Sequence, residues 1–367
     1  MSMRARMQSG PKPHRWSRRG NVPEEQGVTL VDVMVALAVA MLTMVLVYAT
    51  FALAQSARRS AASAADLQAN GAFALSTLSI HAANAGAGLA SATRWLDSCA
   101  AGTDVATTLR PINLLITDGG APDRPDSLVV RQSLARTAGV IAAFVAEAPS
   151  DAPFRIAAVD GYAPGDRVIA ISRTGQCASA TVTTVATSTP GVLDIAHSPI
   201  GIALPVTSVL LNLGPATRAA AMRLDVGGGS LRSTDLTNAD APNPLVANLV
   251  NVKFQYGIDS DGDGAVDTWV AATEGGPWSS AALMTAPRDA LERIQAIRIG
   301  VIIRSERVES AQTRAFHWVL FDCELDDKTA CPGRIEGTIA AAPGGGYRHR
   351  AYETVIPLRN TRWNRGA

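Results

Sequence analysis

The sequence has few of the residues from which metal clusters and catalytic sites are built. Its 367 residues include four cysteines and five histidines, and the histidines stand singly along the chain. The cysteines form no CxxC pair and no Cys/His cluster with zinc spacing, which excludes a zinc-finger type of site. Motifs of the GxSxG, HExxH and P-loop types are also absent. Because no nucleophile can be assigned, we expect a protein that is not an enzyme.

A large net charge of one sign is also missing from the chain after its first 27 residues. The net charge is +1, but the first 27 residues hold six basic and two acidic side chains, a surplus of four, so the remainder carries −3. A surface for nucleic acid normally needs clustered positive charge, and we therefore expect none. The apolar content of 47% is sufficient for a sizeable core.

One long apolar run follows the basic leader. It extends from Val28 to Ala54 and contains a single charged residue, Asp32. About 20 residues suffice to cross a bilayer as a helix, so the run predicts a membrane span. Since the basic residues precede it, residues 1–27 are expected in the cytoplasm and everything after Ala54 in the periplasm.

Two simpler interpretations of this run are open. Ala52-Leu53-Ala54 could be the cleavage site of an ordinary signal peptide, although the apolar run is about twice the usual 7 to 15 residues. A plain signal anchor would explain the hydrophobicity and the charge bias. Neither explains Gly27 at the polar/apolar junction, nor an acid within the span that costs about 2.5 to 3.5 kcal/mol to insert.

Together, the junction and the acid resemble the N-terminus of type IV prepilins. The elements of the resemblance are Gly27, Val28, Thr29, Leu30, Val31 and Asp32. The resemblance implies that a prepilin peptidase cuts after Gly27, that Val28 becomes a methylated N-terminus, and that the apolar helix remains as anchor and later as filament core. Asp32 would then pair with a buried α-ammonium group, such as that of a neighbouring subunit. The family usually has Glu at this position, one methylene longer.

The helix is predicted to continue beyond the membrane. Leu67, Ala74, Leu75 and Leu78 recur at three- and four-residue spacing, and no proline intervenes before Gly86. We therefore expect one helix over residues 28–85, about 85 Å long at 1.5 Å per residue. Its outer half would pack on a globular head.

Residues 86–367 are predicted to form this head, with a β-rich fold and long insertions. Short apolar runs alternate there with Gly, Pro, Asn and Asp. Alternation in 251–256 predicts a strand that buries Val252, Phe254 and Tyr256, and 294–304 is apolar enough for a central strand. Weaker strand candidates are 168–171, 181–185, 192–195 and 352–358. The region 87–217 is large enough for a subdomain. The expected fold class is thus α+β and pilin-like.

An acidic loop is the candidate metal site. Residues 259–267 form a DxDxDGxxD run directly after the 251–256 strand. Alternate carboxylates and a backbone carbonyl could converge on a hard cation, so we expect structural calcium. The predicted ligands are Asp259, Asp261, Asp263, Ala265 and Asp267. The bidentate acid of an EF-hand loop is replaced by Val270, and a solvated Asp/Gly turn is the alternative.

The four cysteines are expected to form disulfides if the head is exported. Cys323 and Cys331 lie on either side of a polar turn, which favours their pairing and leaves Cys99 with Cys177. Four cysteines permit three pairings, and the other two stay open.

Further segments resemble PilW-type minor pilins. They are Asn70–Leu75 with Leu78 and Ala85-Gly86, Tyr256–Asp259, Ala296–Ile299 with Arg304-Ser305, and Val355–Asn360. Two arginines of the first segment are replaced by Ala72 and Ala83, and Leu89–Asp240 matches nothing recognisable. The resemblance implies a non-catalytic subunit that initiates and assembles a type IV pilus with other minor pilins and the major pilin. A minor pseudopilin of a type II secretion system and a signal-anchored periplasmic binding module are the alternatives.

Overall fold

The computed structural model describes residue 27 and residues 29–89, 92–99, 113–136, 141–218, 220–308, 314–323, 331–341 and 346–361. The predicted leader before Gly27 and the new terminus Val28 lie outside the described residues. The chain forms two units, residues 1–59 and residues 60–367. One helix, α1 (Leu30–Ala83), contributes to both units.

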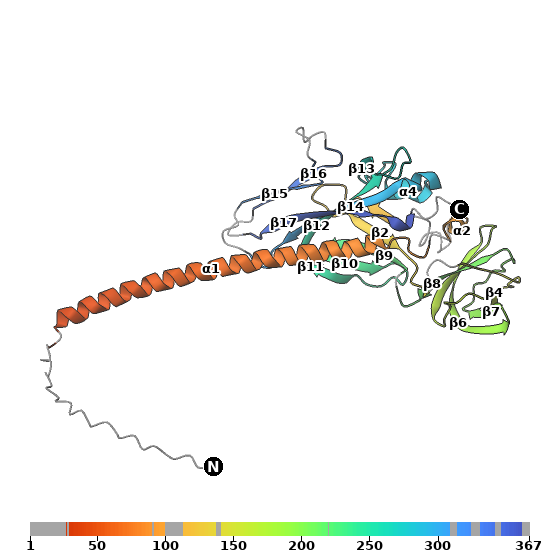
Figure 1. Cartoon of the computed structure of the whole chain (residues 1–367), viewed down its shortest axis with the longest axis horizontal. Coiled ribbons are helices and arrows are strands. Elements are labelled where there is room, and N and C mark those ends of the chain that lie inside the picture. The colour runs from red at the N-terminus through yellow and green to blue at the C-terminus, as the bar shows by residue number, and fades with distance from the viewer. Residues whose placement is uncertain are drawn as a thin grey trace, which may run out of the picture. The chain divides into compact units, whose positions relative to one another are not determined.

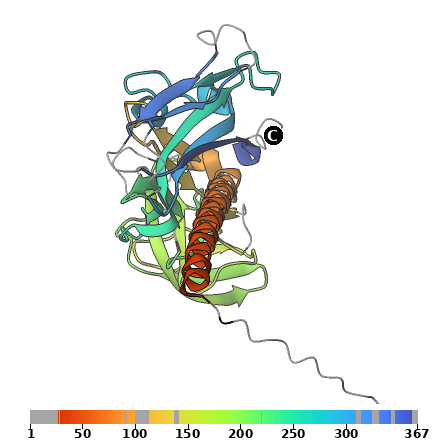
Figure 2. The ribbon, with the colours of Figure 1, turned by 90° about the vertical axis from the view of Figure 1, so that its left-hand side faces the viewer.

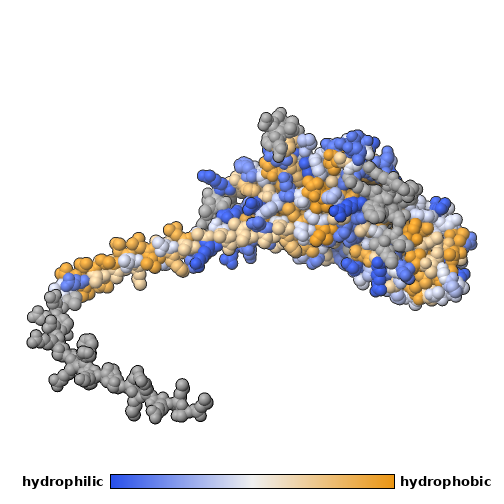
Figure 3. Space-filling view, in the orientation of Figure 1, coloured by the Kyte–Doolittle hydropathy of each residue, from blue (hydrophilic) through white to orange (hydrophobic). Residues whose placement is uncertain are grey.

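The part of α1 in the first unit is apolar and exposed. None of its most apolar 18 residues is buried, and the helix is long and apolar enough to cross a membrane. Apolar residues cover this part of the helix in Figure 3. A helix that is apolar on all sides and is not buried by any other described residue of the chain is typical of a membrane span, in agreement with the sequence.

The predicted fold class, a long apolar helix followed by a β-rich head, is confirmed. The strands are β1 (Leu114–Thr117), β2 (Ser127–Arg131), β3 (Ile141–Ala143), β4 (Phe154–Ala157), β5 (Asp166–Ile171), β6 (Cys177–Thr189), β7 (Val192–His197), β8 (Val209–Pro215), β9 (Ala221–Gly227), β10 (Ser230–Asp235), β11 (Asn243–Ala247), β12 (Leu249–Ile258), β13 (Thr268–Val270), β14 (Ile294–Arg304), β15 (Phe316–Leu320), β16 (Ile335–Ile339) and β17 (His349–Pro357). The short helices are α2 (Thr93–Leu96), α4 (Ser280–Thr285), α5 (Arg288–Glu292) and the 3₁₀ turn η3 (Arg359–Thr361).

Two antiparallel sheets and the second part of α1 share one hydrophobic core. The first sheet has the order β13-β12-β14-β17 and the second the order β1-β2-β9-β10-β11. β14 has the predicted bounds and lies inside its sheet, paired with β12 and β17. The core joins Leu67, Ala74 and Leu78 of α1 to side chains of both sheets, including Phe254 of β12 and Leu224 of β9. Figures 1 and 2 show α1 lying against these strands.

Strand β12 is buried more completely than its alternation predicts. Val252, Phe254 and Tyr256 are buried as expected, but so are Lys253 and Gln255 on the opposite face. The second face is covered by the β1–β2 hairpin loop and by the segment at Gly333, which supply polar partners for both side chains. Alternation therefore identified one buried face correctly and gave no sign that the polar face was also covered.

A six-stranded insertion interrupts the second sheet between β2 and β9. Its strand order is β3-β8-β5-β6-β7-β4, and a bridge between Phe144 and Ile156 joins the two end strands, which closes the sheet into a small barrel. A separate apolar core fills it. Arg131 of β2 pairs directly with Ala221 of β9, so the barrel occupies the place of a hairpin turn. The barrel strands run from residue 141 to residue 215 and so take up only part of the region 87–217, because β1 and β2 belong to the second sheet; they are grouped at one end of the head in Figure 1.

Candidate functional site: the helix, the acidic loop and the disulfides

Thr29 and Asp32 form a reciprocal cap at the start of α1. The N–H and hydroxyl of Thr29 donate to Oδ2 of Asp32 at 3.1 and 2.7 Å. In return, the N–H of Asp32 lies 3.3 Å from the Thr29 hydroxyl oxygen. This is a capping box, in which two unpaired N–H groups of a helix start are satisfied together.

The cap gives Asp32 a local role that the sequence interpretation missed. The T-x-x-D spacing from Thr29 to Asp32 carries the signal for this cap, but the same residues also form part of the prepilin-like motif. Gly27, two residues before the cap, is exposed, and an added Cβ atom there would meet nothing within 4 Å. Gly27 and Asp32 therefore both lie at an accessible helix start.

The second part of α1 presents one narrow stripe to the head. The buried residues are Leu67, Gly71, Ala74, Leu78 and Ala82, at spacings of three and four. Three of the four predicted contact residues are in this stripe, and Leu75 is partly buried beside it. A Cβ atom at Gly71 would collide with Cε2 of Tyr352, so any larger residue requires the ring to move.

Strand β17 runs alongside the same part of α1. Nη2 of Arg348 donates to the Ser60 hydroxyl at 2.9 Å, and Tyr352 lies against Gly71. Past the end of the strand, Nδ2 of Asn360 lies 3.3 Å from the carbonyl oxygen of Ala83 and 3.0 Å from that of Ala85. These contacts connect the strand and its extension to the helix from Ser60 to its last residue, Ala83.

The outward face of this helix is also apolar. Phe73 and Ile80, seven residues apart, are 58% and 57% exposed. Ala65, Ala69 and Ala72 are exposed near them. One part of α1 therefore packs on the head through one face and leaves an apolar face uncovered in the described structure.

The acidic loop brings three of the five predicted metal ligands together. One carboxylate oxygen from each of Asp259, Asp261 and Asp267 lies within 4.8 Å of the other two. Asp263 is outside this group, and its Oδ1 accepts the N–H of Ala265 at 2.6 Å. Gly262 and Gly264, both with positive φ, donate their N–H groups to the buried Asp259 carboxylate at 2.6 and 2.9 Å.

These carboxylates fit a hard cation only in part. Three converging oxygen donors suit Ca²⁺, which takes 6 to 8 oxygen ligands. Val270, at the position of the missing EF-hand acid, pairs with Tyr256 as part of β13 and offers no side-chain oxygen. Hydrogen bonds from the Ser260 hydroxyl and N–H lower the pKa of Asp267, which keeps that carboxylate charged.

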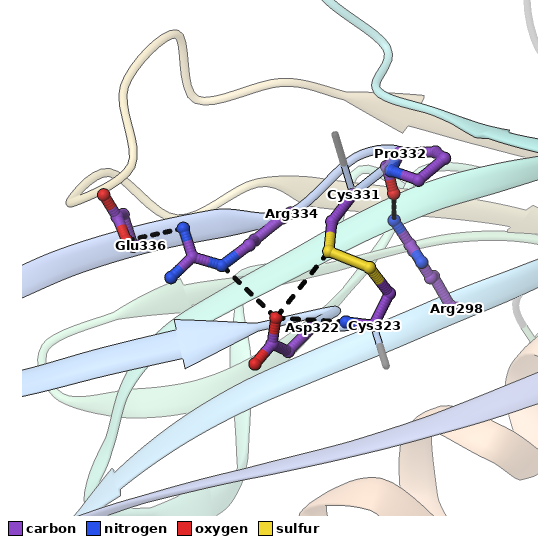
Figure 4. The surroundings of a disulfide bond; sticks show 7 residues. All are labelled: Arg298, Asp322, Cys323, Cys331, Pro332, Arg334 and Glu336. Atoms are coloured by element: carbon purple, nitrogen blue, oxygen red, sulfur yellow. Dashed lines mark hydrogen bonds and ion pairs between the residues drawn. A yellow bond between two sulfur atoms is a disulfide. The ribbon is translucent and has the colours of Figure 1, made fainter. Parts of the chain in front are cut away.

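Two disulfides join the cysteines in the favoured pairs. Cys99 is bonded to Cys177, and Cys323 to Cys331, with Cα separations of 5.5 and 5.7 Å. The first connects the segment after α1 to the inserted barrel. The second lies among polar groups, where Arg298 donates to the carbonyl of Pro332 at 2.8 Å and Arg334 pairs with Asp322 at 3.3 Å (Figure 4).

A buried ion pair supports the sheet beside these groups. Nζ of Lys253 lies 2.8 Å from Oδ1 of Asp126 and 2.8 Å from the carbonyl oxygen of Ala121. Burial raises the pKa of Asp126, and hydrogen bonding and charge from Lys253 oppose this shift. The pair fixes the β1–β2 hairpin on β12, since Asp126 also accepts the N–H of Phe254.

Residues 223–360 match the family model of PilW, described as type IV pilus-assembly protein W. This matching part of the head is called the PilW-type region below. It contains the acidic loop, the Cys323–Cys331 bond and the strands β12, β14 and β17. The resemblance predicted from Tyr256–Asp259, Ala296–Ile299 and Val355–Asn360 is confirmed there.

Among solved structures, a type IV-like pilin from Thermus thermophilus is similar to this chain. The likeness covers 54% of this chain and 85% of that chain, with 11% sequence identity and a TM-score of 0.23. Values this low do not establish a common architecture. Curated protein sequences give no match. The PilW-type region leaves out α1 and the inserted barrel, although its sheets share a core with α1.

Proposed function

We propose that the protein is a non-catalytic minor pilin that helps to initiate and assemble a type IV pilus. The proposal rests on the two different surroundings of α1. Residues 67–82 share one core with the PilW-type region, while the preceding part of the helix is exposed and apolar. Such a helix can serve as a membrane anchor and afterwards as part of a filament. The head would lie in the periplasm, and the partners would be other minor pilins and the major pilin.

Prepilin processing is the first step to test. We propose that a prepilin peptidase cuts after Gly27 and that the new N-terminus at Val28 is methylated. The mass of the N-terminal peptide, from protein isolated from its native inner membrane, decides this. A peptide that begins at Val28 with one methyl group supports the proposal. An uncut chain, or one that begins at Gln55, overturns it.

Asp32 is proposed to pair with the α-ammonium group of a neighbouring subunit. Its capping bond with Thr29 is a competing explanation for an acid at this position. Asp32→Asn distinguishes charge pairing from capping. The amide oxygen of the variant can still accept hydrogen bonds from Thr29, whereas the negative charge is lost. We expect Asp32→Asn to be cut at Gly27 but to remain unassembled, and Asp32→Glu to assemble. Normal incorporation of Asp32→Asn into pili would leave only the capping role.

Calcium in the acidic loop is a further part of the proposal, with a structural role. Convergence of Asp259, Asp261 and Asp267 supports it, and Asp263 provides a matched control because it lies outside that group. In titration calorimetry of the full chain in detergent, Asp261→Ala should abolish calcium binding and Asp263→Ala should retain it. The absence of a binding signal in the wild-type protein, or equal losses in both variants, would reject the site.

Deletion of the gene connects these properties to a cellular system. Loss of surface pili supports the pilus assignment. Loss of enzyme secretion with pili intact would instead assign the chain to a type II secretion system, whose minor pseudopilins use the same kind of anchor.

A further inference from the structure

One end of the head carries a concentration of arginines. The set, called the arginine surface below, consists of Arg304, Arg307, Arg348 and Arg350. They come from the end of β14 and the start of β17, where Arg304 pairs with His349 across the two strands. The described segments 304–308 and 346–350 contain a single acidic residue, Glu306. The local charge is therefore strongly positive in a head that is acidic overall.

Several observations show that these side chains are held in place and available. Arg307 and Arg350 are exposed. The guanidinium carbon of Arg304 lies 4.4 Å from the centre of the Tyr347 ring, and that of Arg350 lies 5.5 Å from the Tyr352 ring. Nε of Arg304 is buried and has no hydrogen-bond partner among the described residues. Burial lowers the pKa of His349, and the nearby charge of Arg304 lowers it further.

Chain connectivity places this surface near the end of the membrane span. Arg348 donates to Ser60 of α1, and Ser60 is six residues after Ala54, where the apolar run ends. Six residues cover about 9 Å as a helix and at most about 20 Å when extended. This limit holds whatever the orientation of the two units. The polar headgroup layer on each side of a bilayer is about 5 to 7 Å thick. Because residues 54–60 are helical, Ser60 lies at most about 4 Å beyond that layer when Ala54 is at the edge of the hydrocarbon, a gap that arginine side chains can span.

We propose that the arginine surface binds the phosphate groups of anionic phospholipids in the membrane that anchors the chain. Guanidinium groups form bidentate hydrogen bonds with phosphate, and their charge is always present. Val308, 56% exposed and adjacent to Arg307, supplies an apolar contact at the headgroup boundary. The head is thereby held against the bilayer before any assembly. The proposal depends on anchoring by α1 and not on a role in a pilus.

The test uses the full chain in lipid nanodiscs. All four cysteines are in disulfides, so Val308→Cys provides a single free thiol for an environment-sensitive NBD label. NBD emission is compared in discs of phosphatidylcholine alone and of equal parts phosphatidylcholine and phosphatidylglycerol. We expect stronger, blue-shifted emission only with phosphatidylglycerol, and its loss in about 0.5 M NaCl, where the Debye length is ~4 Å. Equal emission in both discs would overturn the proposal without any further substitution.

Charge reversal then tests the residues. The double variant Arg307→Glu with Arg350→Glu removes two of the four arginines. We expect the equilibrium constant for binding of the head to the bilayer surface to fall on the order of 30-fold or more. The control, Arg173→Glu with Arg218→Glu, changes the net charge equally at exposed positions of the inserted barrel. Equal effects of the two double variants would also overturn the proposal. Since N-terminal processing is measured separately, either result is distinguishable from failure of the pilin assignment.

Discussion

The two parts of α1 show how one continuous helix can serve two different environments. In the first part, large apolar side chains such as Leu37, Leu46 and Phe51 surround the helix and remain exposed. In the second part, alanine and serine are frequent and only one stripe is buried. The backbone is helical in both parts. The two parts differ in how much of the helix circumference is covered by apolar side chains that must be removed from water: all of it in the first part, and one stripe in the second.

This contrast explains why only the second part requires a specific surface. A helix that is apolar on every side can be solvated by lipid without shape complementarity. A narrow stripe with Gly71 at its middle fits only where a matching surface exists, here the sheet and the ring of Tyr352. Substitutions in the buried stripe of the second part should therefore change the stability of the head, whereas those in the first part should not.

The largest effect is expected for Leu78→Ala, because Leu78 is fully buried in the shared core. Loss of its side chain leaves a cavity and should reduce the free energy of unfolding by about 2 to 5 kcal/mol. Leu46→Ala, the matched change in the first part, should leave it unchanged. Denaturant unfolding of the full chain in detergent, followed by tryptophan fluorescence, measures both. Similar losses for the two variants would contradict the comparison.

Gly71→Val is expected to have the next largest effect. A side chain at this position collides with the Tyr352 ring, and overpacking of this kind costs about 1 to 3 kcal/mol. Ala72→Val, on the exposed side of the same turn, serves as the control and should cost far less. Combining Gly71→Val with Tyr352→Ala should recover part of the loss in the same unfolding measurement. Fully additive losses would show that the ring is not the obstacle.

How far the sequence predicts these features depends on the range of the interactions. Spacing within α1 identified Leu67, Ala74 and Leu78, because the period of a helix is local information. Gly71 was missed as a contact residue, since glycine carries no hydrophobic signal and its partner Tyr352 is far along the chain. The buried polar face of β12 was missed for a similar reason: the partner of Lys253 is Asp126, from another hairpin.

The acidic loop shows a second limit. Alternating aspartates predicted five ligands, Ala265 included, as if every second residue pointed inward. In the structure Gly262 and Gly264 take positive φ, and the resulting path leaves Asp263 outside the group of converging carboxylates. Calcium binding by this loop stays a prediction, and the backbone turns decide which of the predicted carboxylates come together.

Asn360→Ala should have a smaller effect on the second part of α1. The Asn360 amide donates to the carbonyls of Ala83 and Ala85 at the end of the helix, and loss of these bonds should cost about 1 kcal/mol. Asn360→Asp should cost more, because a carboxylate cannot donate and its charge is unfavourable beside helix C-terminal carbonyls. Melting temperatures of the two variants test this order. An Asp variant as stable as the wild type would show that these bonds do not hold the helix end.

Phe73→Ser should have the smallest effect on stability and is the sharpest test of what the exposed face is for. Phe73 is on the second part of α1 but points away from the head, so the change in unfolding free energy should stay within about 0.5 kcal/mol. If the proposed pilin role is correct, the face that stability does not need is used in assembly. We therefore expect Phe73→Ser to be processed and folded normally yet absent from purified pili.

Val355→Ser is the matched control for this last prediction. Val355 is 56% exposed, as Phe73 is 58% exposed, but it lies on β17 instead of the helix. Both variants should unfold like the wild type, and only Phe73→Ser should fail to assemble. If both enter pili normally, the outward face of α1 has no role in contacts between subunits. If Phe73→Ser instead destabilises the head by as much as Leu78→Ala, the helix packs through more than one stripe, and the two parts of α1 differ less than the structure indicates.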